Sequence, residues 1–493
     1  MNDNPAATVA PRHSHYIAGA WTDPTGRSFP DRNPLNGDLV AEIAAGGRPE
    51  AEAAVAAAHA AFPDWAAMRP ADRQRLFLRA AEITEKRHDE AVHLMAVEAG
   101  TSRAFASFQV QLSASLMRQA ASWGYLPYGD VLRSDIPGRM AMVTRKPLGV
   151  VAGFTPWNGA FYLGWRTILL PMAFGNTVVI KPSEEAPLSA GLLHAEILDE
   201  AGFPPGTCNV VTHAPGEVAE IADVFFESRA VRCINFTGSD KTARILAERA
   251  GRALKRMVLE LGGFNPMIVL EDADLDNAAA AVNFGAFFHQ GQICMNTRKV
   301  YVARSVHDDF VGRLAARTRT LKSGDPRDPA VVVGPLINAR ALAQTTERVQ
   351  DAVDRGARVV AGGRAEGMIY HPTILTDVPK DAICTTGRDE TFGPMLVIEP
   401  FDDPEQALRD AQDTPYGLSA AIMTGDPARG LDMAQRFDTG IVHVNGATMA
   451  GEASLPNGGV KDSGWGRSGH YAVEDFTEIR LTTITQGPGR YPF

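Results

Sequence analysis

Apolar, strand-like runs alternate with amphipathic helical segments from Leu148 onward, and this alternation constrains the fold more strongly than any other feature of the chain. The runs cover 148–154, 177–181, 208–212, 231–236 and 256–260. Strands buried on both faces are apolar throughout, and parallel neighbours need helical crossovers between them. The pattern therefore predicts an α/β protein with a parallel, doubly wound sheet.

Helices are expected before this sheet. An alanine-rich stretch begins at Pro49 and runs to Ala61, and a second helical stretch begins at Pro70 and closes at Gly100. Proline is favoured in the first turn of a helix and glycine just beyond its end. With 493 residues, the chain has room for two or three domains and a large core.

Three further segments complete the expected organisation. A protruding hairpin spans 128–143, with its turn at Pro137-Gly138. A second alternating α/β region runs from roughly 261 to 450 and includes strands at 300–302 and 440–444, and residues 480–485 form a late strand. The sequence therefore predicts a second α/β unit after the first.

Charge and composition argue against several classes of function. The formal net charge is −10, from 48 basic and 58 acidic residues, so the chain lacks the excess of basic residues that is typical of proteins that bind nucleic acid. The N-terminus lacks a charged leader followed by an apolar core, and no apolar run is long enough to span a bilayer. We therefore expect a cytoplasmic enzyme with no nucleic-acid or membrane partner.

The four cysteines form no Cys-x-x-Cys pair, so neither a disulfide framework nor a metal site such as zinc is expected. Cys208 and Cys233 lie in strand-like runs, where a buried and inert thiol is expected. Cys294 differs because it lies in the glycine- and glutamine-rich run 288–296. A thiol in such a loop is a candidate nucleophile once it is deprotonated, whereas a small core residue is the alternative.

A carboxylate and an amide are the candidate partners of Cys294. Glu260 ends a strand before Gly262-Gly263, which lets the backbone turn and the carboxylate face a cavity, where it could activate water. A surface glutamate at a strand end is an equally good interpretation. Asn158 follows the strand ending at Phe154, and its N–H could stabilise an oxyanion. A turn-capping asparagine is the alternative.

Two segments at strand ends are candidates for binding a dinucleotide. Lys181-Pro182-Ser183-Glu184 could hold an adenosine ribose through its hydroxyls, although helix capping by Ser183 and Glu184 is the alternative. Gly238-Ser239 precede a helix whose free N–H groups could bind a pyrophosphate. This unit contains no Gly-x-Gly-x-x-Gly, so the standard dinucleotide fingerprint is absent.

Seven motifs, taken in order, resemble the aldehyde dehydrogenase superfamily over almost the whole chain. They are Pro156-Trp157-Asn158, Lys181-Pro182-Ser183-Glu184, Phe236-Thr237-Gly238-Ser239, Leu259-Glu260-Leu261-Gly262-Gly263, Gly291-Gln292-Ile293-Cys294, Glu390-Thr391-Phe392-Gly393-Pro394 and Gly458-Gly459-Val460-Lys461-Asp462-Ser463-Gly464.

The resemblance implies three structural parts. A Rossmann-like, parallel-sheet cofactor domain comprises 1–124 and 147–260, and an α/β catalytic domain comprises 261–455. A small β oligomerisation element comprises 125–146 and 470–493. A homodimer or homotetramer is expected.

The resemblance also implies the roles of individual residues. Cys294 attacks an aldehyde, Asn158 and the Cys294 backbone N–H hold the oxyanion, and Glu260 activates water to hydrolyse the thioester. The implied cofactor contacts are Thr155, Pro156, Trp157, Lys181, Ser183, Glu184, Gly238, Ser239, Gly262, Glu390 and Phe392. NAD is favoured over NADP because the carboxylate of Glu184 would repel a 2′-phosphate, although NADP stays possible and Ser183 could soften the preference.

Two positions depart from the family pattern. Ala243 stands where many relatives have a second glycine of the phosphate-binding segment, and the added methyl is expected to leave binding intact. Phe264 stands directly after Gly262-Gly263, where many relatives have lysine, and no physical reason for it follows from the sequence.

The segments 287–295 and 443–448 are similar to the branch that oxidises aromatic aldehydes such as benzaldehyde, salicylaldehyde or vanillin. An apolar tunnel for a flat ring is expected, although ordinary core packing is the alternative for its aromatic residues. The candidate tunnel residues are Phe161, Tyr162, Trp165, Ile293 and Met295. Arg166 is the candidate receptor for a substrate carboxylate. Alternatives are a dehydrogenase of aliphatic aldehydes or semialdehydes, a CoA-acylating relative, and a non-catalytic binding protein of the same fold.

Overall fold

The computed structural model describes residues 14–22, 27–388, 390–449, 451–488 and 491–493. Its first sheet has eight strands in the order β2-β1-β9-β8-β7-β10-β11-β23. The predicted runs are confirmed as its parallel strands, which are β7 (Val150–Thr155), β8 (Thr177–Pro182), β9 (Cys208–Val210), β10 (Val231–Thr237) and β11 (Arg256–Glu260). The chain is therefore of the predicted α/β class.

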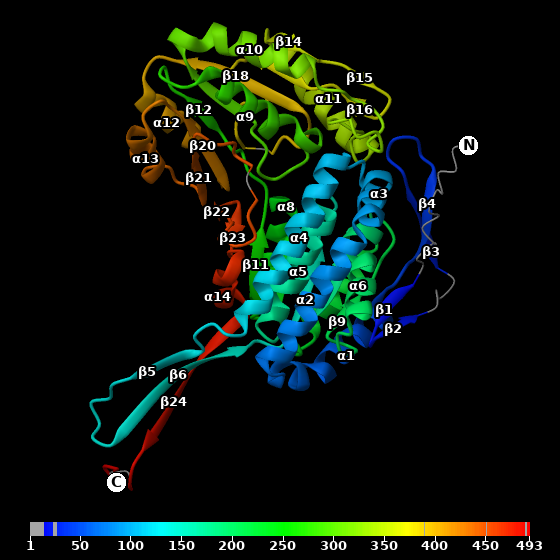
Figure 1. The fold of residues 1–493 in the computed structure, drawn as a ribbon, viewed down its shortest axis with the longest axis vertical. Coiled ribbons are helices and arrows are strands. Elements are labelled where there is room, and N and C mark those ends of the chain that lie inside the picture. The colour runs from blue at the N-terminus through cyan, green and yellow to red at the C-terminus, as the bar shows by residue number, and fades with distance from the viewer. Residues whose placement is uncertain (1–13, 23–26, 389, 450, 489–490) are drawn as a thin grey trace.

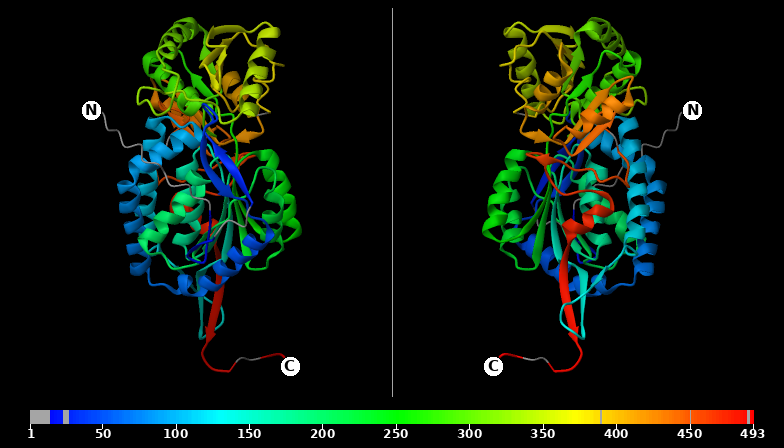
Figure 2. Two further views of the ribbon diagram at one scale, coloured as in Figure 1. Left: turned by 90° about the vertical axis from the view of Figure 1, so that its right-hand side faces the viewer. Right: turned by 90° about the vertical axis from the view of Figure 1, so that its left-hand side faces the viewer.

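Helices cover both faces of this sheet (Figure 2). Successive strand residues point to opposite faces, so Val151 packs into a core with α2, α4, α5 and α6, whereas Val150 and Ala152 pack into a second core with α1, α7 and α8. The helices are α1 (Arg48–Ala67), α2 (Pro70–Lys86), α3 (His88–Ala99), α4 (Arg103–Trp123), α5 (Ala160–Ala173), α6 (Leu193–Ala201), α7 (Val218–Glu227) and α8 (Asp240–Arg252).

The prediction of one helix from Pro70 to Gly100 is wrong, because the helix is interrupted at Arg87. Arg87 has φ −91° and ψ 18°, and it separates α2 from α3. Its guanidinium binds Glu90 at 2.7 Å and Glu196 of α6 at 2.6 Å, so tertiary contacts fix the break. Gly100 ends α3 with φ 64°, as a glycine at a helix end is expected to do.

The strand order places a binding crevice beside β7. From β7 the chain adds β8 and then β9 on one side, and it returns to the other side of β7 for β10 and β11. The order reverses between β7 and β10, and ligands of open α/β sheets bind at the carboxyl ends of strands at such a point. The segments after Thr155, Thr237 and Glu260 all reach this edge.

Antiparallel strands extend the sheet at both edges, which the sequence did not indicate. β1 (His15–Ile17) and β2 (Ala20–Thr22) form a hairpin beside β9. At the other edge β23 (Gly464–Trp465) pairs with β11, with Gly464 opposite Glu260. The motif 458–464 therefore reaches the same end of the sheet as Glu260.

A second, mostly parallel sheet confirms the second α/β unit and lies at the top of Figure 1. Its order is β14-β17-β18-β13-β12-β20-β21. The strands are β12 (Met267–Val269), β13 (Lys299–Ala303), β14 (Arg358–Ala361), β17 (Thr373–Thr376), β18 (Met395–Phe401), β20 (Ser419–Met423) and β21 (Ile441–Val444). The helices are α9 (Leu275–Phe287), α10 (His307–Arg319), α11 (Ala339–Asp354), α12 (Pro404–Gln412) and α13 (Pro427–Gln435).

A three-stranded sheet projects from the body of the molecule (Figure 1). The predicted hairpin forms β5 (Gly129–Leu132) and β6 (Arg139–Pro147), and the late strand is β24 (Thr477–Thr485). β24 pairs with β6 over its whole length, from Thr477 opposite Pro147 to Thr485 opposite Arg139. Segments about 330 residues apart in the sequence therefore form one element.

Short elements complete the description. The strands are β3 (Ser28–Arg32), β4 (Leu39–Ala44), β15 (Ala365–Glu366), β16 (Ile369–Tyr370), β19 (Tyr416–Gly417) and β22 (Val460–Lys461), and the helical segments are η1 (Leu188–Leu192), η2 (Phe288–Gly291), η3 (Arg304–Val306), η4 (Gly469–Ala472) and α14 (Val473–Phe476). Within the described ranges, no helix combines the length and the apolar composition needed to cross a membrane.

Candidate active site

Two cavities meet at the three residues that the sequence proposes as catalytic. A cleft of about 1330 Å³ lies at the carboxyl ends of β7, β10 and β11. A second pocket of about 970 Å³ is lined mostly by apolar side chains. Asn158, Glu260 and Cys294 line both cavities. The structure therefore brings together side chains from three separate segments at the junction of a polar cleft and an apolar pocket.

The loop that carries Cys294 follows a turn of unusual backbone conformation. His289, Gln290 and Gly291 have φ values of 50°, 55° and 69°, in the left-handed region. A Cβ at Gly291 would overlap the carbonyl oxygen of Gly393, so this close approach requires glycine. The turn is held by Gln290, whose Nε2 donates to the carbonyls of Gly100 and Pro335 at 2.9 Å each.

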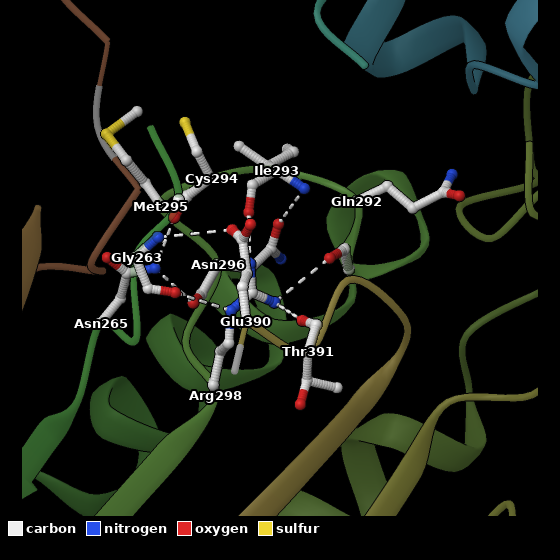
Figure 3. Close-up of polar contacts among 12 residues, drawn as sticks. Gly263, Asn265, Gln292, Ile293, Cys294, Met295, Asn296, Arg298, Glu390 and Thr391 are labelled. Atoms are coloured by element: carbon white, nitrogen blue, oxygen red, sulfur yellow. Dashed lines mark hydrogen bonds and ion pairs between the residues drawn. The ribbon is translucent and has the colours of Figure 1, made fainter. Parts of the chain in front are cut away.

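Buried polar side chains that the sequence did not single out hold the Cys294 backbone (Figure 3). Asn265 Nδ2 donates to the carbonyls of Cys294 at 2.6 Å and Asn296 at 2.9 Å. Asn296 Oδ1 accepts from the Ile293 N–H at 2.8 Å. In Figure 3 the Cys294 sulfur extends away from this network, so the backbone is fixed while the thiol points elsewhere.

Arg298 is the centre of the network. Its guanidinium donates to the carbonyls of Gly263 at 3.0 Å and Ile293 at 3.1 Å, to that of Thr391, and to the carboxylate of Glu390 at 2.9 Å. The Arg298 side chain is only 3% exposed. One buried cation therefore connects the turn after Glu260, the Cys294 loop and the segment 390–391.

Burial raises the pKa of the Cys294 thiol to about 12, and the carboxylates of Glu390 and Glu260 act in the same direction. Arg166 and Arg298 oppose them by favouring the thiolate. The protonated thiol therefore prevails at neutral pH in this state. A nucleophilic role requires that the proton be removed as the reaction begins.

Asn158 is oriented by the same loop. It follows β7, is 8% exposed, and donates from Nδ2 to the Gln292 carbonyl at 3.0 Å. A primary amide carries two N–H donors, and this bond uses one of them. The second is available to an oxygen at the junction of the two cavities. The predicted turn-capping alternative does not match this long-range contact.

Glu260 lies at the end of β11 and is 9% exposed. Burial raises its pKa, and Arg166 opposes this shift by stabilising the carboxylate. Arg166 Nη2 lies 3.5 Å from Glu260 Oε2. The alternative of a surface glutamate is therefore wrong, because the side chain is buried and lies against Arg166.

Most predicted cofactor residues line the cleft. Pro156, Trp157, Gly238, Ser239, Gly262, Glu390 and Phe392 all do so. Trp157 and Phe392 meet edge to face with ring centroids 5.5 Å apart. A Cβ at Gly262 would overlap the Glu390 carboxylate, so glycine permits this approach. Thr155 does not line the cleft: its hydroxyl is buried and donates to the Ala190 carbonyl at 2.9 Å.

Lys181, Ser183 and Glu184 lie at the end of β8, the strand next to β7, but do not line the described cleft. Burial lowers the pKa of Lys181 to about 8, and Glu184 opposes this shift. Glu184 Oε2 lies 3.8 Å from the Nε2 of buried His213, a neighbour that the sequence did not suggest. Ser183 Oγ accepts from the Glu185 N–H at 3.3 Å, which is a turn contact and not a helix cap.

The helix N-terminus in the cleft matches its predicted position. Ser239 is the N-cap of α8, and its Oγ accepts from the Thr242 N–H at 3.3 Å. The first turn of α8 lines the cleft through Asp240, Lys241 and Thr242, and a helix N-terminus at this place is suited to a pyrophosphate. These residues, the Glu390 carboxylate and the switch point beside β7 fit a dinucleotide such as NAD or NADP.

Three of the five predicted tunnel residues, Tyr162, Ile293 and Met295, line the apolar pocket. Phe161 and Trp165 do not, and this part of the prediction is corrected. Both are 0% exposed and pack in the core against His194, because they lie on the side of α5 that faces the sheet and η1. The sequence missed Phe105, Phe108 and Leu112 of α4, although their spacing of three and four residues could have indicated a shared face.

The structure accounts for the two departures from the family pattern only in part. Ala243 is 2% exposed and packs in the core between α8 and the sheet, so its methyl group is accommodated there. Phe264 is 4% exposed and lies beside β19 and the end of α12. Nothing in the structure explains why phenylalanine stands at this position.

Comparison with known proteins gives a consistent result. The sequence model of the aldehyde dehydrogenase family matches residues 21–482. The chain is similar to a vanillin dehydrogenase of Pseudomonas fluorescens, with 45% identity over 468 residues that cover 95% of this chain and 96% of that protein. It is also similar to a salicylaldehyde dehydrogenase of Pseudomonas putida, with 38% identity over 481 residues, 97% of this chain and 99% of that protein.

A solved structure agrees over the full fold. The crystal structure of a salicylaldehyde dehydrogenase from Pseudomonas putida G7, complexed with salicylaldehyde, matches with a TM-score of 0.95 and 36% identity. The match covers 98% of this chain and 100% of that chain. The chain therefore belongs to the aldehyde dehydrogenase family and is an oxidoreductase that acts on aldehydes.

Proposed function

We propose that the enzyme oxidises aromatic aldehydes to carboxylic acids through a covalent intermediate on Cys294, with NAD as the favoured oxidant. The observation that carries the proposal is that Asn158, Glu260 and Cys294 line both the polar cleft and the apolar pocket. An aldehyde carbon entering from the pocket then meets the thiol at the point where a cofactor in the cleft ends.

The first step forms a thiohemiacetal. Cys294 loses its proton, and its Sγ attacks the aldehyde carbon, so that a C–S bond forms and the carbonyl π electrons move onto oxygen. The second N–H of Asn158 Nδ2 and the backbone N–H of Cys294 donate to this oxyanion. Donors aimed at such an oxygen are worth about 2.7–4 kcal/mol in the transition state. The bond from Asn158 to Gln292 keeps the amide in position beforehand.

The second step is oxidation. A nicotinamide cofactor held in the cleft by Trp157, Glu390 and Phe392 would supply the hydride acceptor. As the oxyanion collapses to a carbonyl, the hydrogen on the former aldehyde carbon departs with its electron pair, and a thioester remains on Cys294. Within the chain, Trp157 and Phe392 shape the cleft beside the junction, and Gly262 leaves room for the Glu390 carboxylate.

The third step is hydrolysis. Glu260 takes a proton from water, whose oxygen attacks the thioester carbon, and the C–S bond breaks to release the acid and the Cys294 thiolate. Arg166 stabilises the ionised form of Glu260 from 3.5 Å, so that a buried carboxylate can still act as a base. A general base with access to water supports hydrolysis over transfer of the acyl group to CoA.

The apolar pocket supports an aromatic substrate. Phe105, Phe108, Phe284 and Tyr162 contribute rings to its walls. Arg166 is the basic side chain among its described lining residues, and its charge is paired with Glu260. A semialdehyde carboxylate would therefore compete with Glu260 for the same cation, which disfavours that alternative. The relatives named for vanillin and salicylaldehyde oxidation agree with this preference.

NAD is favoured over NADP because Glu184 would repel a 2′-phosphate at the end of β8. We assign 1–124 and 147–260 to cofactor binding, 261–455 to the catalytic domain, and 125–146 with 470–493 to oligomerisation as a homodimer or homotetramer. The exposed apolar side chains of β5, β6 and β24 support this last assignment. A cytoplasmic location is part of the same proposal.

A substrate panel with one variant tests the proposal. Wild-type enzyme should reduce NAD with benzaldehyde-type substrates at a higher kcat/KM than with aliphatic aldehydes or semialdehydes, and with NADP less efficiently. Cys294→Ala should form no NADH. Cys384→Ala is the matched control, because Cys384 is buried away from both cavities. NADH formation by Cys294→Ala would exclude the covalent route, and a preference for semialdehydes would exclude the substrate class.

A further inference from the structure

One wall of the apolar pocket is a single face of α4. Phe105, Phe108, Gln109 and Leu112 all line the pocket, at the spacing that places side chains on one side of a helix. Gln109 is the polar member of this set and is 2% exposed. A buried amide among apolar side chains is costly unless its polar atoms are hydrogen-bonded. Its placement here therefore needs an explanation.

The orientation of the Gln109 amide is fixed. Gln109 Oε1 accepts a hydrogen bond from the backbone N–H of Tyr162 in α5, at 3.3 Å. A backbone N–H can only donate, so the atom that faces it must be the amide oxygen. The nitrogen, Nε2, then occupies the other position, and it has no hydrogen-bond partner among the residues that the structure describes. Both N–H donors of this buried nitrogen therefore lack a partner within the described chain, in a residue that lines the apolar pocket.

The side chains around Gln109 indicate which chemical group would accept a hydrogen bond from its Nε2. The neighbouring wall residues Phe105, Phe108 and Phe284 suit an aromatic ring. A neutral donor matches a neutral acceptor, such as the oxygen of a ring hydroxyl or methoxy group. A carboxylate would be buried there without a counter-charge, because Arg166 is already paired with Glu260.

We propose that Gln109 is a specificity residue that selects benzaldehydes carrying an oxygen substituent on the ring, by donating a hydrogen bond from Nε2 to that oxygen. This inference rests on the aromatic aldehyde oxidation proposed above and names the ring substituent that the pocket recognises. The amide oxygen accepts the hydrogen bond from the Tyr162 backbone in α5, and the amide nitrogen donates to the oxygen substituent of the substrate.

The first test compares substrates on the wild-type enzyme. The kcat/KM is measured for benzaldehyde, for the three hydroxybenzaldehydes, for the corresponding methylbenzaldehydes and for 3-methoxybenzaldehyde. At least one oxygenated substrate should have a kcat/KM about fivefold higher than that of its methyl counterpart, because one neutral hydrogen bond distinguishes groups of similar size. If no oxygenated substrate exceeds its methyl counterpart, the proposal is overturned without any variant.

The second test uses Gln109→Met and its matched control. The ratio of kcat/KM for the preferred oxygenated substrate to that for benzaldehyde should fall about fivefold in Gln109→Met. Gln111→Met is the same change on the exposed face of α4 and should keep the wild-type ratio. Gln109→Leu removes the donor without introducing a carboxyl group that could be protonated and donate in its place, and it should lose the preference as well.

The outcomes separate this inference from the proposed function. An unchanged ratio in both Gln109 variants overturns the role of Gln109 while aromatic oxidation stands. A loss of preference in Tyr162→Phe, with Gln109→Met unchanged, assigns the selection to the tyrosine hydroxyl and also overturns it. A wild-type enzyme that oxidises no benzaldehyde of any kind overturns the proposed function, and this inference with it.

Discussion

The roles of Glu260 and Cys294 can be separated at the scale of single residues. Glu260→Gln keeps the size of the side chain but removes the base, so the thioester should form and then persist. Mixing this variant with NAD and benzaldehyde should give one burst of NADH followed by steady turnover at least about 100-fold slower than wild type. Intact mass spectrometry should find the added acyl group on Cys294. Normal steady turnover without that added mass would remove the proposed role of Glu260.

The pH dependence of Cys294 follows from its raised pKa. Alkylation by iodoacetamide requires the thiolate, and a pKa of about 12 means that the thiol stays protonated through the neutral range. The alkylation rate of the free enzyme should therefore rise about tenfold for each pH unit from about pH 7 to about pH 9, without a plateau. Peptide mapping at Cys294 provides the measurement, and a plateau near the ordinary pKa of about 8.5 would contradict the environment described here.

Sequence reasoning placed correctly the residues at or just after the end of a strand. Asn158, Ser239 and Glu260 could be placed because the carboxyl ends of parallel strands meet at one edge. Phe161 and Trp165 were misplaced because helical spacing shows which residues share a face but not what that face packs against. Arg298 and Gln109 were missed because their partners, Glu390 and the Tyr162 backbone, lie 92 and 53 residues away in the sequence.

The Cys294 loop is an element whose geometry depends on Arg298. Arg298→Met would leave Glu390 buried without its counter-charge and three loop carbonyls without their donor. Removing one partner of a buried ion pair costs about 3–5 kcal/mol, so urea unfolding should show a destabilisation of this order. The double variant Arg298→Met/Glu390→Gln should lose less than Arg298→Met alone, because no unpaired charge remains.

An exposed ion pair is the matched control for this element. Arg304 and Asp402 are paired at 2.7 Å, but their side chains are 59% and 72% exposed. Arg304→Met should therefore leave the urea midpoint unchanged, because solvent screens such pairs. If Arg298→Met were as mild as Arg304→Met, the network in Figure 3 would not be what fixes the loop.

At the scale of elements, local sequence patterns located the hairpin and the late strand, whereas only the family resemblance grouped 125–146 with 470–493 in one β element. Prolines and glycines marked the turn at Pro137-Gly138, which is a local signal. The pairing of β24 with β6 joins distant segments, and no local pattern specifies a partner strand. The break at Arg87 was missed for the same reason, since it depends on Glu196 of a different helix.

For the whole molecule, the projecting sheet of β5, β6 and β24 should be the contact between subunits. Its exposed apolar side chains include Val131 at 71%, Ile479 at 64% and Leu481 at 62% exposure. A thin element gains little stability from the body of its own chain, and apolar groups exposed in this way mark an interaction surface. Ile479 and Leu481 lie two residues apart in β24 and so share one face of the sheet.

We therefore expect light scattering coupled to size-exclusion chromatography to give the mass of a dimer or tetramer for wild type. Ile479→Glu/Leu481→Glu should reduce that mass, because two charges would be buried in the contact. Leu431→Glu places a charge at an exposed apolar side chain of α13, outside the projecting sheet, and serves as the control for the position of the contact. A monomeric wild type, or a double variant with undiminished mass, would show that the apolar side chains of this sheet do not form the contact between subunits.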